Sequence, residues 1–430
     1  MKRSAWLAFL ALSLCFLLAA LETQLGNAAP GAAKPPVKKL AVVDFYDIAD
    51  VTTVREPKPL SNAVKKGLEW LAKQQNIDGG WTPTERAAHG PSSELGCSAI
   101  CLMAFLRSGN SANNGPYQRT VNKGLAFLIR VVSEEDKAPR WPKPALPVSQ
   151  IQSKLGMFAD LFLANLALAE FRGKAGQHEH GVAVCLEKTL NKVLSLQTAE
   201  GRYRGNEQGW APVLAMGLAN KGVARARIHG GRFDDIFCQR AFEYSLASVL
   251  RRPARPDKLA LGVPREEDAG VPLYRVSQGA TNIYDIANAY RYELARMRLF
   301  ANDPLEIENV KKAAHRAERL VQHFDGVRRE LLDKLQEPQF VQGVGTIGGE
   351  ELLSYWNVSE VLVLEGGEAW QKWDGRMAEI LERSQDADGS WSGQHCLTSR
   401  VFCTAAAILV LTADRTPFPR VMLNDLRAER

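Results

Sequence analysis

The sequence predicts an all-α fold in which six helix hairpins close into an (α/α)6 toroid. Three observations predict it. A Gln-x-x-x-Gly-x-aromatic motif recurs along the 430 residues. Its copies are separated by multiples of about 60 residues, which is typical of a repeat architecture. An amphipathic helix pattern precedes each copy, and a more apolar pattern follows. A single helix pair cannot bury its apolar face, whereas a closed ring of pairs leaves no exposed terminal repeat.

The repeated motif is interpreted as a structural turn. Its glycine permits a tight exit from a helix, its aromatic ring packs across the turn, and its Gln amide can satisfy free backbone groups at a helix end. If the ring closes, the first and last copies should lie side by side. The motif residues are Gln75, Gly79 and Trp81 in the first copy, Gln197, Gly201 and Tyr203 in the middle copy, and Gln385, Gly389 and Trp391 in the last copy.

The N-terminus predicts export. Lys2 and Arg3 precede an unbroken apolar run, and the small residues of GNAA follow it, so residues 1–29 have the pattern of a signal peptide. An uncleaved N-terminal anchor is the alternative. We expect a periplasmic or secreted protein with no membrane span in the mature chain.

The rest of the chain divides by composition. Residues 30–60 are rich in Pro and Lys at both ends and predict a linker with one short strand candidate at 40–48. The toroid is expected over residues 61–418, followed by a tail at 419–430.

The helix pairs follow from periodicity. The first helix of a pair carries one apolar face, with residues at i, i+3, i+4 and i+7, whereas the second is apolar all round and should be buried. The one-faced pattern is formed by Val64, Gly67, Leu68 and Leu71, and again by Trp373, Met377, Ile380 and Leu381. The six apolar helices contain GCSAICLMAFL, FADLFLANLALAEF, WAPVLAMGLA, YDIANAYRYELA, YWNVSEVLVLE and VFCTAAAILVL.

Composition argues against a nucleic-acid-binding protein. Hydrophobic residues make up 46% of the chain, charged residues 24%, and the net charge is +6. Lys and Arg are scattered and do not interleave with aromatic residues, so no basic face for a phosphate backbone is expected.

The motif copies, at this period and before Ala- and Leu-rich helices, resemble the prenyltransferase and squalene-oxidase repeat, the QW motif of triterpene cyclases. The resemblance covers residues 60–415 and implies the toroid. It does not carry over the chemistry of the family. The Asp-x-Asp-Asp acid motif of squalene–hopene cyclases is absent, as is the Asp-x-Cys pair with which protein prenyltransferases bind zinc. The thioester motif of complement-type toroids is absent as well. No cofactor is therefore expected.

Polar residues within the apolar helices are the candidates for chemistry. Asp160, Asp285 and Glu360 would converge in the centre of a toroid, where a carboxyl with a raised pKa can serve as a general acid or base. His395 precedes the last apolar helix. The alternative is that these residues face water, cap helices or satisfy one another.

Aromatic residues of the same helices have two interpretations. They either line a cavity for an apolar or sugar ligand or pack in the core. The candidates are Trp210, Tyr284, Tyr355 and Trp356.

Cysteines fall on the first and last apolar helices, which should be neighbours. Cys97 and Cys101 are spaced i, i+4, and Cys396 and Cys403 are spaced i, i+7. Three outcomes remain open, namely disulfides that join the two helices, a zinc site that includes His395, and ordinary buried thiols.

Three functions therefore compete. The first is a protein that binds an apolar, isoprenoid-like or extended ligand in the toroid cavity. The second is an enzyme, either a divergent terpenoid cyclase or prenyltransferase-like enzyme, or a polysaccharide lyase or hydrolase. The third is a protein-interaction module. The Pro- and Arg-rich segment 251–275 is long for a compact fold and could serve as a lid or a partner surface.

Overall fold

A computed structural model describes residues 57–83, 93–134, 149–229, 231, 233–250, 268–300, 308 and 323–416. The chain divides into two units, Met1–Asp47 and Ile48–Arg430, and the described residues all lie in the second. The predicted signal peptide, the strand candidate, most of the 251–275 segment and the C-terminal tail lie outside them.

The prediction of an all-α protein is confirmed. The described residues form fourteen α-helices and no strand, with two isolated bridge pairs at Trp81–Glu94 and Gln197–Tyr203. None of these helices is long and apolar enough to cross a membrane.

Six of the helices are amphipathic, and six are largely buried. In α2, for example, Lys65, Lys66 and Glu69 are exposed, whereas every residue of α3 is buried. The amphipathic helices are α2 (Asn62–Lys73), α4 (Gln118–Ser133), α7 (Glu179–Leu196), α9 (Ile236–Leu250), α12 (Phe324–Leu335) and α15 (Gly367–Ser384). The buried helices are α3 (Leu95–Arg107), α6 (Ala159–Phe171), α8 (Pro212–Ile228), α10 (Pro272–Phe300), α14 (Gly349–Glu365) and α16 (Arg400–Leu411).

Short elements connect these helices. They are α5 (Gln150–Leu155), α13 (Pro338–Gln342), and the 3-10 turns η3 (Gly176–His178) and η4 (Ala413–Arg415). Serine side chains fix three helix starts. Ser61 accepts the N–H of Val64 before α2, Ser149 forms a capping box before α5, and Ser399 caps α16.

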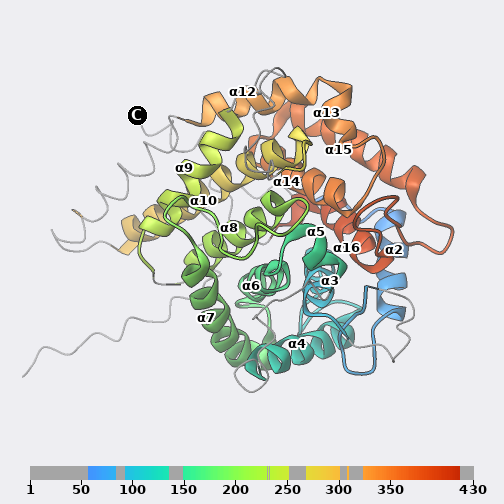
Figure 1. The fold of residues 1–430 in the computed structure, drawn as a ribbon. Helices are drawn as coiled ribbons and strands as arrows, with labels where there is room; N and C mark the ends of the chain where they lie inside the picture. The colour runs from blue at the N-terminus through green and yellow to red at the C-terminus, as the bar shows by residue number, and fades with distance from the viewer. Residues whose placement is uncertain are drawn as a thin grey trace, which may run out of the picture. The chain divides into compact units, whose positions relative to one another are not determined.

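The buried helices pack against one another in chain order. Contacts join α3 to α6, α6 to α8, α8 to α10, α10 to α14 and α14 to α16, and α16 also contacts α3. Each buried helix therefore packs against at least two others, and α8 also contacts α14. Figure 1 shows α3, α6 and α8 nearer the middle of the helix group than α4 and α7.

The motif turns have the geometry that only glycine adopts readily. The φ angles of Gly79, Gly201 and Gly389 are +92°, +83° and +94°. A Cβ on Gly79 would stand 2.3 Å from Lys123 O, on the next amphipathic helix. The glycine therefore permits both the left-handed turn and its close approach to that helix.

The motif glutamines join each turn to the following amphipathic helix. Gln75 Nε2 donates to Gly79 O at 2.8 Å within its own turn and to Thr120 O of α4 at 2.9 Å. Gln197 Nε2 donates to Phe237 O of α9 at 2.9 Å. Each amide thus donates to a carbonyl near the start of the next amphipathic helix, which makes the turn a connection between neighbouring helix pairs.

The motif tryptophans repeat a single set of contacts. The indole Nε1 of Trp81 donates to Leu71 O at 2.8 Å, and that of Trp391 donates to Leu381 O at 2.8 Å. Their backbone N–H groups donate to hydroxyls of the following buried helix, Ser98 Oγ and Thr404 Oγ1, both at 2.9 Å. Both rings are buried, so each tryptophan locks an amphipathic helix, a turn and a buried helix together.

Candidate functional site

Two contacts show how the buried helices are oriented. Tyr274, the third residue of α10, donates from Oη to Glu351 Oε1, in the third residue of α14, at 2.5 Å. Arg107, the last residue of α3, pairs with Glu170 in the last turn of α6 at 2.6 Å. Starts meet starts and ends meet ends, so these helices run parallel. Their two ends are called here the N-terminal end and the C-terminal end.

The N-terminal end holds a group of metal-ligand type. One donor atom from each of Glu350, Glu351 and His395 lies within 4.8 Å of the other two. Both glutamates are fully buried, and the His395 side chain is 18% exposed. The glutamates stand in the first turn of α14, and His395 lies in the segment before α16. Two neighbouring buried helices therefore place carboxylate and imidazole donors together.

Glu351 is fully engaged by hydrogen-bond donors. Besides Tyr274, the backbone N–H of Gly348, the N-cap residue of α14, donates to Glu351 Oε2 at 3.0 Å. His395 Nε2 lies 2.9 Å from Glu351 Oε2 and 3.0 Å from Thr346 O. A carbonyl only accepts, so His395 Nε2 carries a proton, and in the matching neutral tautomer Nδ1 is the bare nitrogen. Glu351 thereby orients the imidazole.

Two buried atoms of this group have no hydrogen-bond partner, namely Glu350 Oε1 and His395 Nδ1. The other carboxylate oxygen of Glu350 accepts the N–H of Leu397 at 3.1 Å. Burial raises the pKa of Glu350 to about 7, and the adjacent Glu351 adds to that shift. A lone carboxylate oxygen and a lone imidazole nitrogen in one buried group are suited to bind a cation or to share a proton.

Cys396 follows His395 in an unusual backbone conformation. Its φ of +50° is left-handed, which is uncommon for a residue with a side chain. Burial and the nearby Glu350 raise the pKa of its thiol, so Cys396 is not an activated thiolate.

A second carboxyl pair occupies the N-terminal ends of α3 and α6. Burial raises the pKa of Glu94 to about 7 and that of Asp160 to about 6, and Asp160 adds to the shift of Glu94. Gln152 Nε2 donates to Asp160 Oδ2 at 3.1 Å, whereas Asp160 Oδ1 and Glu94 Oε2 have no partner. A Cβ on Gly96 would stand 2.3 Å from Asp160 Oδ1, so the glycine makes room for this carboxyl.

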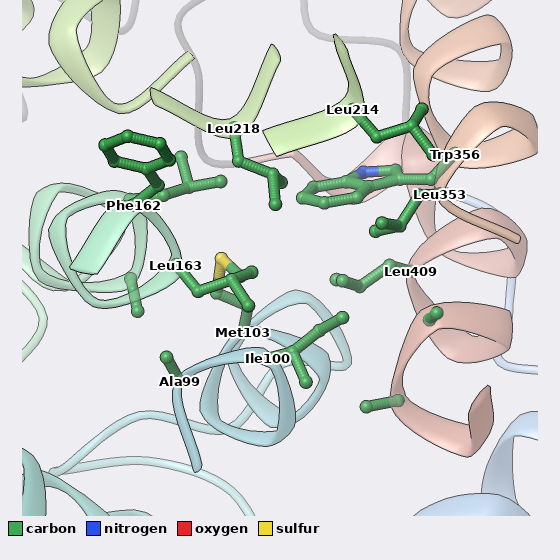
Figure 2. Packing of buried hydrophobic residues seen from close by; sticks show 14 of the residues in the cluster. Ala99, Ile100, Met103, Phe162, Leu163, Leu214, Leu218, Leu353, Trp356 and Leu409 are labelled. Atoms are coloured by element: carbon green, nitrogen blue, oxygen red, sulfur yellow. The ribbon is translucent and has the colours of Figure 1, made fainter. Parts of the chain in front are cut away.

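An apolar layer follows the N-terminal end. Figure 2 shows labelled side chains from α3, α6, α8, α14 and α16 that point toward one another. We use the name apolar layer for Ala99, Ile100, Met103, Phe162, Leu163, Leu214, Leu218, Leu353, Trp356 and Leu409, none of which is more than 3% exposed. Side chains thus fill the space between the buried helices at this level.

The C-terminal end carries a buried ion network that links five helices. It consists of Arg107, Glu170, Lys221, Arg225, Asp285 and Glu360, from α3, α6, α8, α10 and α14. Glu360 receives three cations, Arg107 at 2.5 Å, Arg225 at 3.0 Å, and Lys221. Three cationic and three acidic side chains pair here, which is what burial of charge requires.

The protonation tendencies of the network follow its geometry. Burial alone would raise the pKa of Glu360, but Arg225, Lys221 and Arg107 together hold it well below its usual value. Burial raises the pKa of Asp285, against the attraction of Lys221 and Arg225. Glu360 is therefore the ionised centre of the network, and its cations leave it poorly suited to act as a general base.

Trp356 joins the apolar layer to the ion network. Its Nε1 donates to Glu360 Oε1 at 3.0 Å, and Arg107 and Lys221 each lie 5.1 Å from its ring centroid. Among the four aromatic residues considered from the sequence, Trp356 is the one that Figure 2 shows between the buried helices.

The other three aromatic candidates lie elsewhere. Tyr355 donates to Val341 O at 2.8 Å and packs edge-on against Trp373, so it faces α13 and α15. Trp210 is partly exposed and stacks edge-on with Tyr274 at the N-terminal end. Tyr284 is buried on α10.

The predicted catalytic residues separate into two places. Asp160 and His395 lie at the N-terminal end, whereas Asp285 and Glu360 belong to the ion network at the C-terminal end. Glu350 and Glu351 were not predicted from the sequence, although two adjacent carboxylates open an otherwise apolar helix. Four residues of the ion network were not predicted either, although charges inside apolar helix patterns mark them, namely Arg107, Glu170, Lys221 and Arg225.

The cysteines considered as disulfide or zinc residues, Cys97, Cys101, Cys396 and Cys403, carry free thiols. Burial raises the pKa of Cys97 and Cys101 well above the usual value, so these thiols are neutral. Within the described part of the chain, the group with metal-ligand spacing contains two glutamates and a histidine and no cysteine.

Comparison with known proteins gives no family assignment. No protein-family model, curated protein or solved structure matches this chain. Any functional conclusion therefore depends on the site itself.

Proposed function

We propose that the helix pairs close into a six-membered (α/α)6 toroid of the QW-repeat type, with the six buried helices on the inside. Two observations support it. The buried helices contact one another in chain order, and α16 contacts α3. In addition, Gln385 of the last motif donates to Ala63 O in α2, the first described helix, at 2.9 Å. The same device that joins neighbouring pairs therefore also joins the last pair to the first.

Within this toroid, the proposed function is metal-assisted binding of a small ligand at the N-terminal end. Glu350 and His395 supply the metal-ligand atoms, Glu351 completes the group, and Tyr274 with the Gly348 backbone holds Glu351 in place. The observation that carries the proposal is the pair of buried, unpartnered donors, Glu350 Oε1 and His395 Nδ1, within one compact group.

Zinc is the ion that best fits this donor set. Imidazole nitrogen with carboxylate oxygens is a ligand combination of catalytic zinc sites. Here Glu350 and His395 would be the ligands, Glu351 would hold the imidazole, and water or substrate would take the remaining positions. Deprotonation of Glu350 is coupled to metal binding, because its raised pKa makes the proton compete with the metal near neutral pH. Such a site would favour the hydrolase or lyase among the enzyme alternatives.

The test is the metal content of the full chain, purified without chelating resin or chelator and measured by inductively coupled plasma mass spectrometry. We expect roughly one zinc ion per chain, and its loss in Glu350→Gln and His395→Gln. Glu207→Gln and His180→Gln are matched controls, because both residues are exposed. Metal-free wild-type protein that also fails to bind added zinc in calorimetry would overturn the proposal.

A second function, binding of an apolar ligand between the inner helices, is favoured by one observation. Apolar side chains from five buried helices converge between the polar N-terminal end and the ion network (Figure 2). A ligand at this level must displace side chains that now touch one another. A terpenoid cyclase receives less weight, because the deep carboxylates Asp285 and Glu360 are committed to ion pairs.

We also propose that the protein is exported and, as a third possible function, that it binds another protein. The signal pattern at residues 1–29 supports export, and a protein-interaction function would use the outer helices. A packed toroid with neither metal nor ligand would favour that third function.

A further inference from the structure

Helix α10 carries a polar stripe on the face that it turns toward α8 and α14. Tyr274, Gln278, Thr281 and Asp285 are spaced i, i+4, i+7 and i+11, so they share one face. Tyr274 is bonded to a carboxylate of α14. Lys221 Nζ of α8 donates to Thr281 Oγ1 at 3.0 Å and lies 3.3 Å from Asp285 Oδ2. Three of the four stripe residues therefore have partners.

Gln278 is the exception. Its residue exposure is 0%, and neither its Oε1 nor its Nε2 has a hydrogen-bond partner. A side-chain amide offers two donors and an acceptor. Leaving such a group buried and unpaired is costly, so buried amides normally have partners. Gln278 is thus a buried amide whose donors and acceptor are still available for hydrogen bonds.

The opposite helix makes room for this amide. A Cβ on Gly217 of α8 would stand 2.6 Å from Gln278 Cγ. Gly217 lies in the middle of α8, where glycine is less favourable than alanine. The glycine therefore makes room for the Gln278 side chain itself, at a cost to helix stability.

The surroundings decide what chemistry the site accepts. Gln278 lies along the stripe between Tyr274 and the ion-network residue Asp285, and it approaches α8 at Gly217, between Leu214 and Leu218 of the apolar layer. The charges one turn or two further along these helices, those of Lys221 and Asp285, are paired within the ion network. A charged group would be desolvated there without a counter-ion, whereas an uncharged hydroxyl or carbonyl would meet an amide in an apolar environment.

We propose that Gln278 hydrogen-bonds an uncharged hydroxyl or carbonyl group of an otherwise apolar ligand that lies between α8, α10 and α14. This inference rests on the apolar-ligand function given above and is independent of the metal site. The ligand would carry one polar group, and Gln278 would recognise that group.

The test uses two isosteric probes, benzyl alcohol and ethylbenzene, which differ by a hydroxyl in place of a methyl group. Their dissociation constants are measured by ligand-observed NMR for the full wild-type chain and for Gln278→Leu. We expect the substitution to shift the ratio of the two constants by about five- to ten-fold in favour of ethylbenzene, since one neutral hydrogen bond is lost.

Asn282→Leu is the matched control. Asn282 is an equally buried amide one turn away, but its Nδ2 donates to Ala241 O and Ser245 Oγ on the side of α9. We expect it to leave the probe ratio unchanged. Circular dichroism establishes that each variant is folded.

The possible results distinguish the role of Gln278 from the binding of apolar ligands in general. If both probes bind and Gln278→Leu leaves their ratio unchanged, the role of Gln278 is wrong and the apolar-ligand function stands. If neither probe binds wild-type protein, and a high-resolution crystal structure shows an ordered water only at Gln278, both are wrong.

Discussion

The side chain of Gln385 donates to the backbone carbonyl of Ala63, 322 positions earlier in the chain, at 2.9 Å. The same Nε2 donates to Gly389 O at 2.8 Å, as Gln75 does to Gly79 O. One amide therefore holds the last turn closed and attaches it to the first helix.

Replacement of this glutamine tests its contribution to stability. Gln385→Ala removes both hydrogen bonds that the amide donates, to Gly389 O and to Ala63 O. We expect a loss of about 1–3 kcal/mol in the free energy of unfolding, measured by urea denaturation. Gln371→Ala, at an exposed position of α15, should change it by less than about 0.5 kcal/mol. Equal effects of the two substitutions would show that the Gln385 contacts contribute nothing beyond helix propensity.

Two glycines with nearly equal φ separate backbone strain from steric clash. Gly79 and Gly109 have φ of +92° and +87°, but a Cβ on Gly79 would stand 2.3 Å from Lys123 O, whereas nothing lies within 4 Å of one on Gly109. Gly109→Ala should cost about 1–2 kcal/mol for the left-handed conformation alone. Gly79→Ala should cost clearly more, because the turn must also move away from α4. Thermal denaturation of both variants measures the difference, and a smaller loss for Gly79→Ala would contradict the close approach.

The ion network should be far more sensitive than a surface pair. Arg107→Met leaves Glu170 and Glu360 short of a cation in a buried environment, and we expect a loss of about 3–5 kcal/mol. The exposed pair Lys372–Glu368 is the control, and Lys372→Met should cost at most about 0.5 kcal/mol. Chemical denaturation gives both values. Comparable losses would mean that water reaches the network.

The carboxyl of Asp160 predicts a specific pH dependence. Its pKa is raised to about 6 by burial, whereas that of an unfolded Asp is about 3.9. Between these values the folded state binds more protons, so the free energy of unfolding falls as the pH rises and levels off above about pH 6. Asp160→Asn removes this titration.

The measurement compares the two proteins by urea denaturation at pH 4 and pH 7. Wild-type protein should lose about 2–3 kcal/mol more than Asp160→Asn over this interval. A wild-type protein whose extra loss is absent, or that gains stability relative to the variant as the pH rises, would place the Asp160 carboxyl in water or beside a cation.

Periodicity in the sequence predicts the helices well, because each helix pattern reflects which of its own faces is buried. The 3.6-residue pattern of apolar residues distinguishes α2, which exposes Lys65 and Lys66 on one face, from α3, which is buried on all sides. The motif also predicts its own turn chemistry, because the positive φ of Gly79 is a local property of the chain.

The sites were harder to predict, because they depend on contacts between helices. Glu360 is one charge in an apolar helix until Arg107, Lys221 and Arg225 are placed beside it, and these come from two other helices. The pairing of His395 with Glu351 likewise depends on the approach of the α16 start to the α14 start. A single sequence without helix packing cannot specify such partners.

The two ends of the described fold lie against each other. Lys58 N–H donates to Asp414 Oδ2 at 2.8 Å, and Arg415 donates to Lys58 O. The chain could therefore be joined at this junction, and new termini could be placed in a surface turn such as that at Gly109, without loss of any contact between helices. The contacts between hairpins do not depend on which hairpin comes first in the chain. A circularly permuted chain should therefore reach the same native state.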